Sequence, residues 1–304
     1  MSKILVLTGA TGKKSGGILA EHIGRNLNVI KSAFPDGIRA VVRGSSNTSK
    51  LTTLIPGVEL YAGGFGNDNL LSAFEKADTV LHVAGIHGSR AVVSAAAERG
   101  VRRLILVHTT GIYSKYKAAG EEYRNIDDFV YRTCAERNII LTILRPTMIY
   151  GNCTDQNVVK FIKMVDKLPV MPVVNGARYA LQPVHYKDLG KAYFDVLMNE
   201  ESTANKDFIL SGGEPILLKD MLLEIGKCLG KDVKFVSCPF PVAYSGAWVI
   251  FCLTFGKMDY REKVQRLCEP RCFPYEEATK AFGYRPMTFQ QGIADEVREY
   301  LERK

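Results

Sequence analysis

The stretch Ile4-Leu5-Val6-Leu7-Thr8-Gly9-Ala10-Thr11-Gly12-Lys13-Lys14-Ser15-Gly16 decides the fold of this 304-residue chain. Its first five residues are an apolar run typical of a buried β-strand, and the glycine-rich part that follows opens a helical pattern over residues 16–26. Gly9 permits a tight turn, Gly12 lets the backbone approach a pyrophosphate, and Gly16 lets helix and strand pack closely. The helix N-terminus then directs N–H groups at the phosphates. The predicted phosphate loop also includes Thr11, Lys13, Lys14 and Ser15.

Short apolar runs alternate with amphipathic stretches along the rest of the first half. Further strands are predicted at 38–42, 58–61, 79–83, 104–107 and 139–144. Helices are predicted between them at 69–74, 90–99 and 120–137. Strands that are apolar on both faces and separated by helices indicate a parallel sheet covered on both sides. Right-handed crossovers then give an α/β, doubly wound Rossmann fold.

The rhythm changes after residue 151, where helices dominate. Helical patterns cover residues 158–167, 187–198, 218–229 and 289–302. Residues 181–186 and 208–211 are typical of strands, and we expect both to return to the sheet. We therefore expect a nucleotide-binding Rossmann domain over residues 1–151. Residues 152–304 form a mixed segment that rejoins the sheet and builds a smaller, mostly helical substrate lobe.

Composition narrows the class of protein. Hydrophobic residues make up 46% of the chain and charged residues 24%, as in ordinary globular proteins. The net charge of +8 comes from scattered residues, which indicates a solvated surface or contacts with nucleotide phosphates. Nucleic acid is not expected as a partner, because no nucleic-acid motif is present. Seven dispersed cysteines without a C-x-x-C pair predict reduced thiols and no metal site, and the lack of a signal-peptide pattern predicts a soluble, cytoplasmic protein.

The most apolar later stretch covers residues 242–255. It is shorter than the ~18–20 residues of a membrane span, so we expect a buried helix. The alternative is an interfacial helix that touches a membrane surface through Trp248 and Phe251, with Lys257, Arg261 and Lys263 close by in the sequence.

The end of the second predicted strand bears on the nucleotide. Proteins of this fold that bind NAD place an Asp or Glu there, which holds the ribose hydroxyls. Here the strand is followed by Arg43-Gly44-Ser45, without an acid. A guanidinium pairs bidentately with a 2′-phosphate, which a carboxylate would repel. The sequence therefore predicts NADP, bound by Arg43 with help from Lys13, Lys14 and Ser45, and NAD is the alternative.

Further segments resemble the extended branch of the short-chain dehydrogenase/reductase family, which includes epimerases and dehydratases. The similar segments are Val80-Leu81-His82-Val83-Ala84-Gly85, Leu144-Arg145-Pro146-Thr147-Met148-Ile149-Tyr150-Gly151, residues 183–189 and Phe282-Gly283-Tyr284-Arg285-Pro286. The resemblance implies that Ala84, Gly85, Pro146, Thr147 and Met148 lie against the cofactor. The family's Asp after strand three is replaced by Gly64, and we expect Phe65 to pack against the adenine instead.

The resemblance places the catalytic hydroxyl of the family on Thr109. The family also uses a Tyr that exchanges the proton and a Lys, four residues later, that lowers the pKa of this Tyr. At the family spacing, Gly120 stands in place of the Tyr and Arg124 in place of the Lys. The standard dyad is therefore missing, although Arg124 is still able to hold a ribose or phosphate oxygen.

Two replacements for the dyad are open. Tyr113 and Lys117 form a literal Y-x-x-x-K directly after strand five, and Tyr123 lies beside Arg124 on the predicted helix. The competing interpretation is that these tyrosines only line the cleft or pack within it.

Three functions follow from these features. The first is an NADP-dependent oxidoreductase or epimerase that transfers hydride to or from a nucleotide-linked sugar or another hydroxylated small molecule, with Arg178 and Arg266 as phosphate contacts. The second is an NADP-binding, redox-sensing regulatory module, which the missing dyad favours. The third is a peripheral membrane enzyme. The family resemblance also implies a homodimer built through the helix at 120–137.

Overall fold

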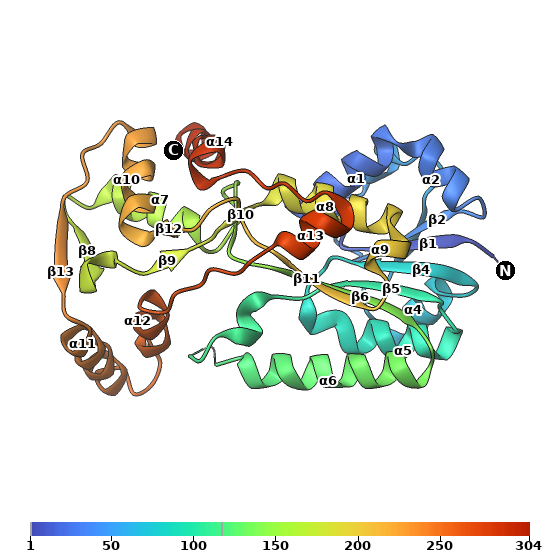
Figure 1. Cartoon of the computed structure of the whole chain (residues 1–304), viewed down its shortest axis with the longest axis horizontal. Helices are drawn as coiled ribbons and strands as arrows, with labels where there is room; N and C mark the ends of the chain where they lie inside the picture. The colour runs from blue at the N-terminus through green and yellow to red at the C-terminus, as the bar shows by residue number, and fades with distance from the viewer. Residues whose placement is uncertain (1, 117) are drawn as a thin grey trace.

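The computed structural model describes residues 2–116 and 118–304 and is built on a seven-stranded sheet. All six strand pairings are parallel, and the strand order is β11-β6-β5-β4-β1-β2-β3 (Figure 1). The strands are β1 (Ile4–Thr8), β2 (Ile38–Val42), β3 (Glu59–Ala62), β4 (Ala77–His82), β5 (Arg103–Val107), β6 (Ile140–Pro146) and β11 (Lys206–Leu210). This order confirms the predicted Rossmann fold.

Helices cover both faces of the sheet. One face packs against α1 (Ser15–Arg25), α2 (Leu27–Ala33), α3 (Ser49–Leu54), α8 (Tyr186–Met198) and α13 (Glu276–Phe282). The other packs against α4 (Asn67–Ala73), α5 (Ser89–Arg99) and α6 (Gly120–Glu136). Because β1 lies between β4 and β2, the chain leaves the centre of the sheet in opposite directions there, and the carboxyl ends of these strands border a crevice.

The remaining elements gather at one end of the molecule. A third hydrophobic cluster joins α7 (Val158–Lys167), α10 (Leu218–Leu229) and α14 (Phe289–Glu302) with β8 (Met171–Val174). Beyond it lie β13 (Phe235–Cys238), α11 (Phe240–Leu253) and α12 (Arg261–Leu267) (Figure 1). The helices predicted at 158–167, 218–229 and 289–302 have the predicted bounds.

One strand prediction is wrong and its companion is confirmed. Residues 181–186 do not rejoin the sheet, because they divide into β9 (Ala180–Leu181), paired with β12 (Ile216–Leu217), and β10 (Val184–His185), paired with β7 (Ile149–Tyr150). Pro183 lies between them and has no N–H to donate to a continuous ladder. The strand predicted at 208–211 is β11 and pairs with β6.

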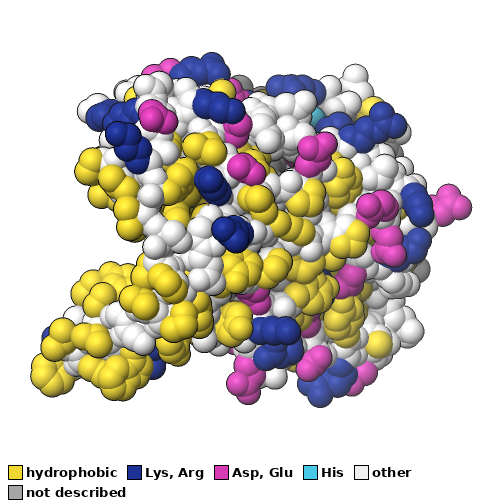
Figure 2. Space-filling view, turned by 60° about the vertical axis from the view of Figure 1, so that its left-hand side comes forward, with side chains coloured by type: hydrophobic (Ala, Val, Ile, Leu, Met, Phe, Trp, Pro, Cys, Tyr) yellow, Lys and Arg dark blue, Asp and Glu magenta, His cyan; other side chains and the backbone are white. Residues whose placement is uncertain are grey.

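The expectation of a buried helix at 242–255 is also wrong. The helix α11 forms, but Ala247 is its only buried residue. Leu253 is 74% exposed, and Phe255 just beyond the helix is 93% exposed. Figure 2 shows this apolar surface projecting from the molecule. Apolar composition predicted the helix, but none of residues 2–116 and 118–304 packs over most of its surface.

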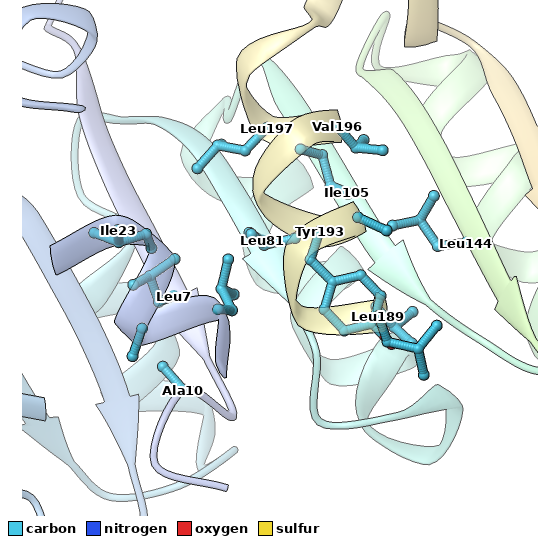
Figure 3. Packing of buried hydrophobic residues seen from close by; sticks show 14 of the residues in the cluster. Leu7, Ala10, Ile23, Leu81, Ile105, Leu144, Leu189, Tyr193, Val196 and Leu197 are labelled. Atoms are coloured by element: carbon cyan, nitrogen blue, oxygen red, sulfur yellow. The ribbon is translucent and has the colours of Figure 1, made fainter. Parts of the chain in front are cut away.

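Helix α8 ties the second half of the chain to the sheet. Leu189, Tyr193, Val196 and Leu197 follow the i, i+4, i+7, i+8 spacing of one helical face. Figure 3 shows them packed over strand residues Leu7, Leu81, Ile105 and Leu144, within a cluster that is almost fully buried.

This packing predicts that Leu81→Ala lowers the free energy of unfolding by about 2–5 kcal/mol, because it leaves a cavity between β4 and the helices. Urea denaturation measures the change. Leu60→Ala in β3, where the side chain is 39% exposed, is the matched control and should change stability by about 0.5 kcal/mol or less. Equal losses in both variants would contradict the assignment of the core.

Candidate functional site

The loop between β1 and α1 is closed by contacts that only glycine permits. Gly9 has φ +82°, and a Cβ there would lie 2.9 Å from the backbone nitrogen of Ala84. A Cβ at Gly16 would overlap the carbonyl oxygen of Gly9. The first turn of α1 therefore sits directly on the loop, and its N–H groups face the carboxyl end of the sheet.

A cavity of about 940 Å³ lies beside this loop. Its volume is that of a pocket for a large ligand. It collects thirteen of the fifteen residues predicted to bind the cofactor: Gly9, Thr11, Gly12, Lys13, Lys14, Ser15, Gly16, Arg43, Ser45, Phe65, Ala84, Gly85 and Pro146. The two others, Thr147 and Met148, line a neighbouring cavity.

The charged side chains that line this large cavity are all basic. Lys13, Lys14 and Arg43 line it, and no lining residue in the described part of the chain is Asp or Glu. Arg43 is exposed and stands at the end of β2 beside Ser45 and Ser46. An anionic ligand would be attracted to this wall. If the ligand carried a further phosphate, the guanidinium of Arg43 would be available to pair with it.

A buried histidine supports the opposite wall. His82 is wholly buried, and burial lowers its pKa to about 4, so the ring is neutral. Its Nε2 lies 2.9 Å from the carbonyl oxygen of Gly85, which only accepts, so Nε2 carries the proton. Nδ1 then accepts from the Thr8 hydroxyl at 2.6 Å. Phe65 packs edge-on against the His82 ring, with the two ring centroids 5.4 Å apart, and it also lines the cavity.

A second, smaller cavity of about 220 Å³ adjoins the first. His108 and Pro146 line the large cavity, whereas their chain neighbours Thr109 and Thr147 line the small one. Consecutive Cα atoms are only ~3.8 Å apart, so the two cavities lie side by side at the carboxyl ends of β5 and β6. A ligand in the large cavity and another in the small one are thereby brought within reach of each other.

Thr109 is the hydroxyl at this junction. Its Oγ1 accepts a hydrogen bond from the Gly111 N–H at 3.0 Å, which orients the oxygen. The hydroxyl proton remains available to a substrate oxygen in the small cavity. Thr109, to which the resemblance assigns the family's hydroxyl, therefore lines the small cavity with its oxygen held in place.

Of the candidate catalytic residues, the two tyrosines lie together and Arg124 lies elsewhere. Tyr113 and Tyr123 both line the small cavity. Tyr123 is buried against His87, and burial together with Glu122 raises its pKa. Arg124, the next residue on α6, is exposed and does not line either cavity. Lys117 lies outside the described residues.

The small cavity holds two arginines from the second half of the chain. Arg266 was predicted as a substrate contact, and Arg271 was missed. Both have a buried Nε without a hydrogen-bond partner among the described residues. Burial and the neighbouring Arg266 lower the pKa of Arg271 to about 10, so it stays cationic at neutral pH. Arg178, the other predicted contact, is exposed and lines neither cavity.

His108 belongs to a buried charged network beneath the site. Its Nδ1 lies 2.7 Å from Asp127 and its Nε2 lies 2.9 Å from the Ser89 hydroxyl. Asp127 also pairs with Arg145 at 2.7 Å, and Arg145 with Asp207 at 2.7 Å. Burial outweighs these partners and lowers the pKa of His108. This histidine is a satisfied core residue that holds β5 and α6 together.

Comparison with known proteins agrees with this geometry. Residues 22–167 match the family model described as NAD(P)H-binding. The chain is 21% identical to UDP-glucose 4-epimerase of Vibrio cholerae over 71% of this chain and 68% of that protein. It is 21% identical to 2-alkyl-3-oxoalkanoate reductase of Stenotrophomonas maltophilia (strain K279a) over 70% of this chain and 72% of that protein.

A solved structure shares the fold along the whole chain. UDP-glucose 4-epimerase from Thermotoga maritima, determined with UDP-glucose, superposes with a TM-score of 0.71 at 15% identity and covers 99% of both chains. These findings confirm the NAD(P)-binding domain and the resemblance to the epimerases, dehydratases and reductases of the extended short-chain dehydrogenase/reductase family.

The close approach at Gly16 predicts that Gly16→Ala weakens NADPH binding at least about tenfold, the equivalent of about 1.4 kcal/mol, because α1 must move away from the loop. Titration of NADPH fluorescence measures the change. Gly44→Ala is the matched control, because nothing lies within 4 Å of a Cβ there and its φ is not positive. Unchanged affinity in Gly16→Ala would remove the loop from the binding site.

Proposed function

We propose that this chain, which resembles the extended short-chain dehydrogenases/reductases, is an NADP-dependent enzyme that transfers hydride to or from a hydroxylated small molecule. A nucleotide-linked sugar is the preferred substrate class. The observation that carries the proposal is the junction of the two cavities: a cationic, acid-free cavity for a dinucleotide meets a small cavity with an oriented hydroxyl and two cationic side chains.

The preference for NADP rests on Arg43. Gly9, Gly12 and Gly16 leave room for a pyrophosphate at the N-terminus of α1. Arg43 then lies at the end of β2, where proteins of this fold meet the ribose of the adenosine half. A guanidinium favours a 2′-phosphate there and offers no acceptor to ribose hydroxyls. Bound in this cavity, the nicotinamide would supply the hydride donor or acceptor.

The substrate assignment rests on the small cavity. A volume of about 220 Å³ accommodates the reacting end of a ligand, and the remainder extends outward. Arg266 and Arg271 are suited to phosphate or carboxylate oxygens, because each still has an unused buried N–H. The epimerase from Thermotoga maritima was solved with UDP-glucose, whose diphosphate has this chemistry. Residues 1–151 then hold the cofactor, and residues 152–304 supply the cationic wall.

Proton transfer requires a group in the small cavity. Thr109 donates to the reacting oxygen and holds it beside the large cavity. Tyr123 is the tyrosine on α6 that faces the same space. Burial raises its pKa, and Arg266 is the neighbouring cation that opposes this rise. We therefore assign the positioning of the oxygen to Thr109 and the exchange of the proton to Tyr123.

A regulatory role is the second candidate function. Gly120 and Arg124 occupy the family positions of the Tyr and the Lys, and the side chain of Arg124 is exposed. A chain that binds NADPH at this cavity but turns over no substrate would act as a sensor of the cofactor. Turnover on any member of a panel of keto and hydroxyl substrates excludes this role.

The cofactor assignment predicts that NADPH binds more tightly than NADH and that Arg43→Ala weakens NADPH binding by about 1.5–3 kcal/mol, the range for a hydrogen bond to a charged group. Parallel fluorescence titrations measure both affinities. Arg25→Ala is the control, because Arg25 is exposed, pairs with Glu21 and lies outside the cavity. Equal or absent binding of both dinucleotides would overturn the NADP assignment.

The catalytic assignment predicts that Thr109→Val lowers kcat by about 10²–10³, the range for removing a preorganised donor, while NADPH affinity stays unchanged. Steady-state rates of NADPH consumption measure the effect once a substrate is found. Thr53→Val, an exposed threonine of α3, is the control. A Thr109→Val variant with normal kcat would leave the hydroxyl with a packing role only.

A further inference from the structure

Helix α11 forms an apolar projection that the described part of the chain leaves largely exposed. Its fourteen residues, Phe-Pro-Val-Ala-Tyr-Ser-Gly-Ala-Trp-Val-Ile-Phe-Cys-Leu, include no charged side chain. The helix packs mainly against α12, and Figure 2 shows the resulting apolar lobe standing out from the surface. The large exposed apolar side chains of this region are Val242, Trp248, Val249, Ile250, Leu253, Phe255 and Met258.

Helix α11 is apolar on every side, and much of it is exposed. Val242, Val249 and Leu253 are spaced i, i+7, i+11 and form one exposed stripe along the helix, and Trp248 and Ile250 are exposed as well. Ala247 is buried. A surface helix normally presents polar side chains to the surroundings, whereas this one presents apolar ones. A contiguous exposed patch of this kind marks a site of interaction.

Positive charge follows the patch along the chain. Residues 254–266 carry four basic and two acidic side chains, a net charge of +2. Arg261 pairs with Asp259 at 2.7 Å and lies over the ring of Phe251 at 4.0 Å. Lys257 and Lys263 are exposed, and neither has a carboxylate within 4.0 Å among the described residues. A partner that is apolar inside and anionic at its surface matches both features.

We propose that residues 240–263, the apolar arm, dock this protein on the surface of an anionic lipid bilayer. The arm lies in the interface: the stripe of Val242, Val249 and Leu253 enters the acyl boundary, and Lys257 and Lys263 meet lipid phosphates. No helix in the described residues is long and apolar enough to cross a membrane. At ~1.5 Å per residue, the fourteen residues of α11 span ~21 Å, less than the ~30 Å of a hydrocarbon core.

The arm is connected to the small cavity through α12. The same seven-residue helix carries Arg261, which covers Phe251, and Arg266, which lines the cavity. Its length is ~10 Å at ~1.5 Å per residue. A docked arm therefore brings the small cavity near the lipid headgroups. The docking itself depends only on the arm and stands or fails independently of the reaction.

Trp248 makes the proposal directly measurable, because it is the single tryptophan of the chain and lies in the exposed part of α11. The full chain is mixed with vesicles of phosphatidylcholine alone or with added phosphatidylglycerol. We expect the protein to cosediment with the anionic vesicles and the emission of Trp248 to shift to the blue. Lys257→Gln and Lys263→Gln should each weaken binding about fivefold, the effect of one lysine at a charged surface.

Substitutions in the arm and on a distant surface distinguish docking by the arm from nonspecific binding to vesicles. Leu253→Glu with Phe255→Glu should lower binding to anionic vesicles at least about tenfold, while the melting temperature and the affinity for NADPH stay unchanged, because both side chains are exposed. Val29→Glu is the matched control: this valine is 54% exposed on α2, far along the chain from the arm, and should leave vesicle binding intact.

Three outcomes would overturn the proposal. The first is no cosedimentation and no shift of Trp248 emission at low salt. The second is vesicle binding that the double glutamate variant retains. The third combines two results: the wild-type protein does not bind vesicles, and it forms a dimer in solution that the double glutamate substitution converts to a monomer. The arm would then pack against a second copy of the chain.

Discussion

The contact between Gly16 and the carbonyl of Gly9 is the constraint on which the site depends. It seats the first turn of α1 directly on the loop after β1. Gly9, in turn, contacts the backbone of Ala84 after β4, so the loops of the two central strands are held together. The crevice of a doubly wound sheet opens at this place. A side chain at either glycine would separate α1, the loop and β4, which together form this wall of the large cavity.

The second half of the chain completes what the first half begins. Helix α8 supplies a row of buried side chains to the core of the sheet, and β11 adds a strand beside β6. The chain can then return beneath the small cavity, where Arg266 and Arg271 face Thr109. The loop that lines the large cavity is therefore local in sequence, whereas the wall of the small cavity joins residues about 160 positions apart.

This difference explains how much the sequence could predict. The six strands of the first half were predicted, and most of the residues proposed to bind the cofactor line one cavity, because glycine spacing and apolar runs act locally. Arg271 was missed because its role comes from burial and from the approach of distant residues, which no local pattern encodes. Arg124 and Tyr123 are adjacent in sequence, and only the rotation of α6 shows which of them faces the cavity.

The apolar arm is a second feature that the sequence predicts only in part. Composition predicts that residues 242–255 form a helix that avoids water, but it does not state what covers that helix. A helix buried in the core would need neighbours on every side, and within the described residues α11 packs mainly against α12. Lys257 and Lys263, which have no carboxylate partner among the described residues, would be costly to bury beside a purely apolar partner, since buried charges require counter-charges. A bilayer of anionic lipids has an apolar interior, which would accommodate the apolar side chains of α11, and anionic headgroups, which would pair with the two lysines.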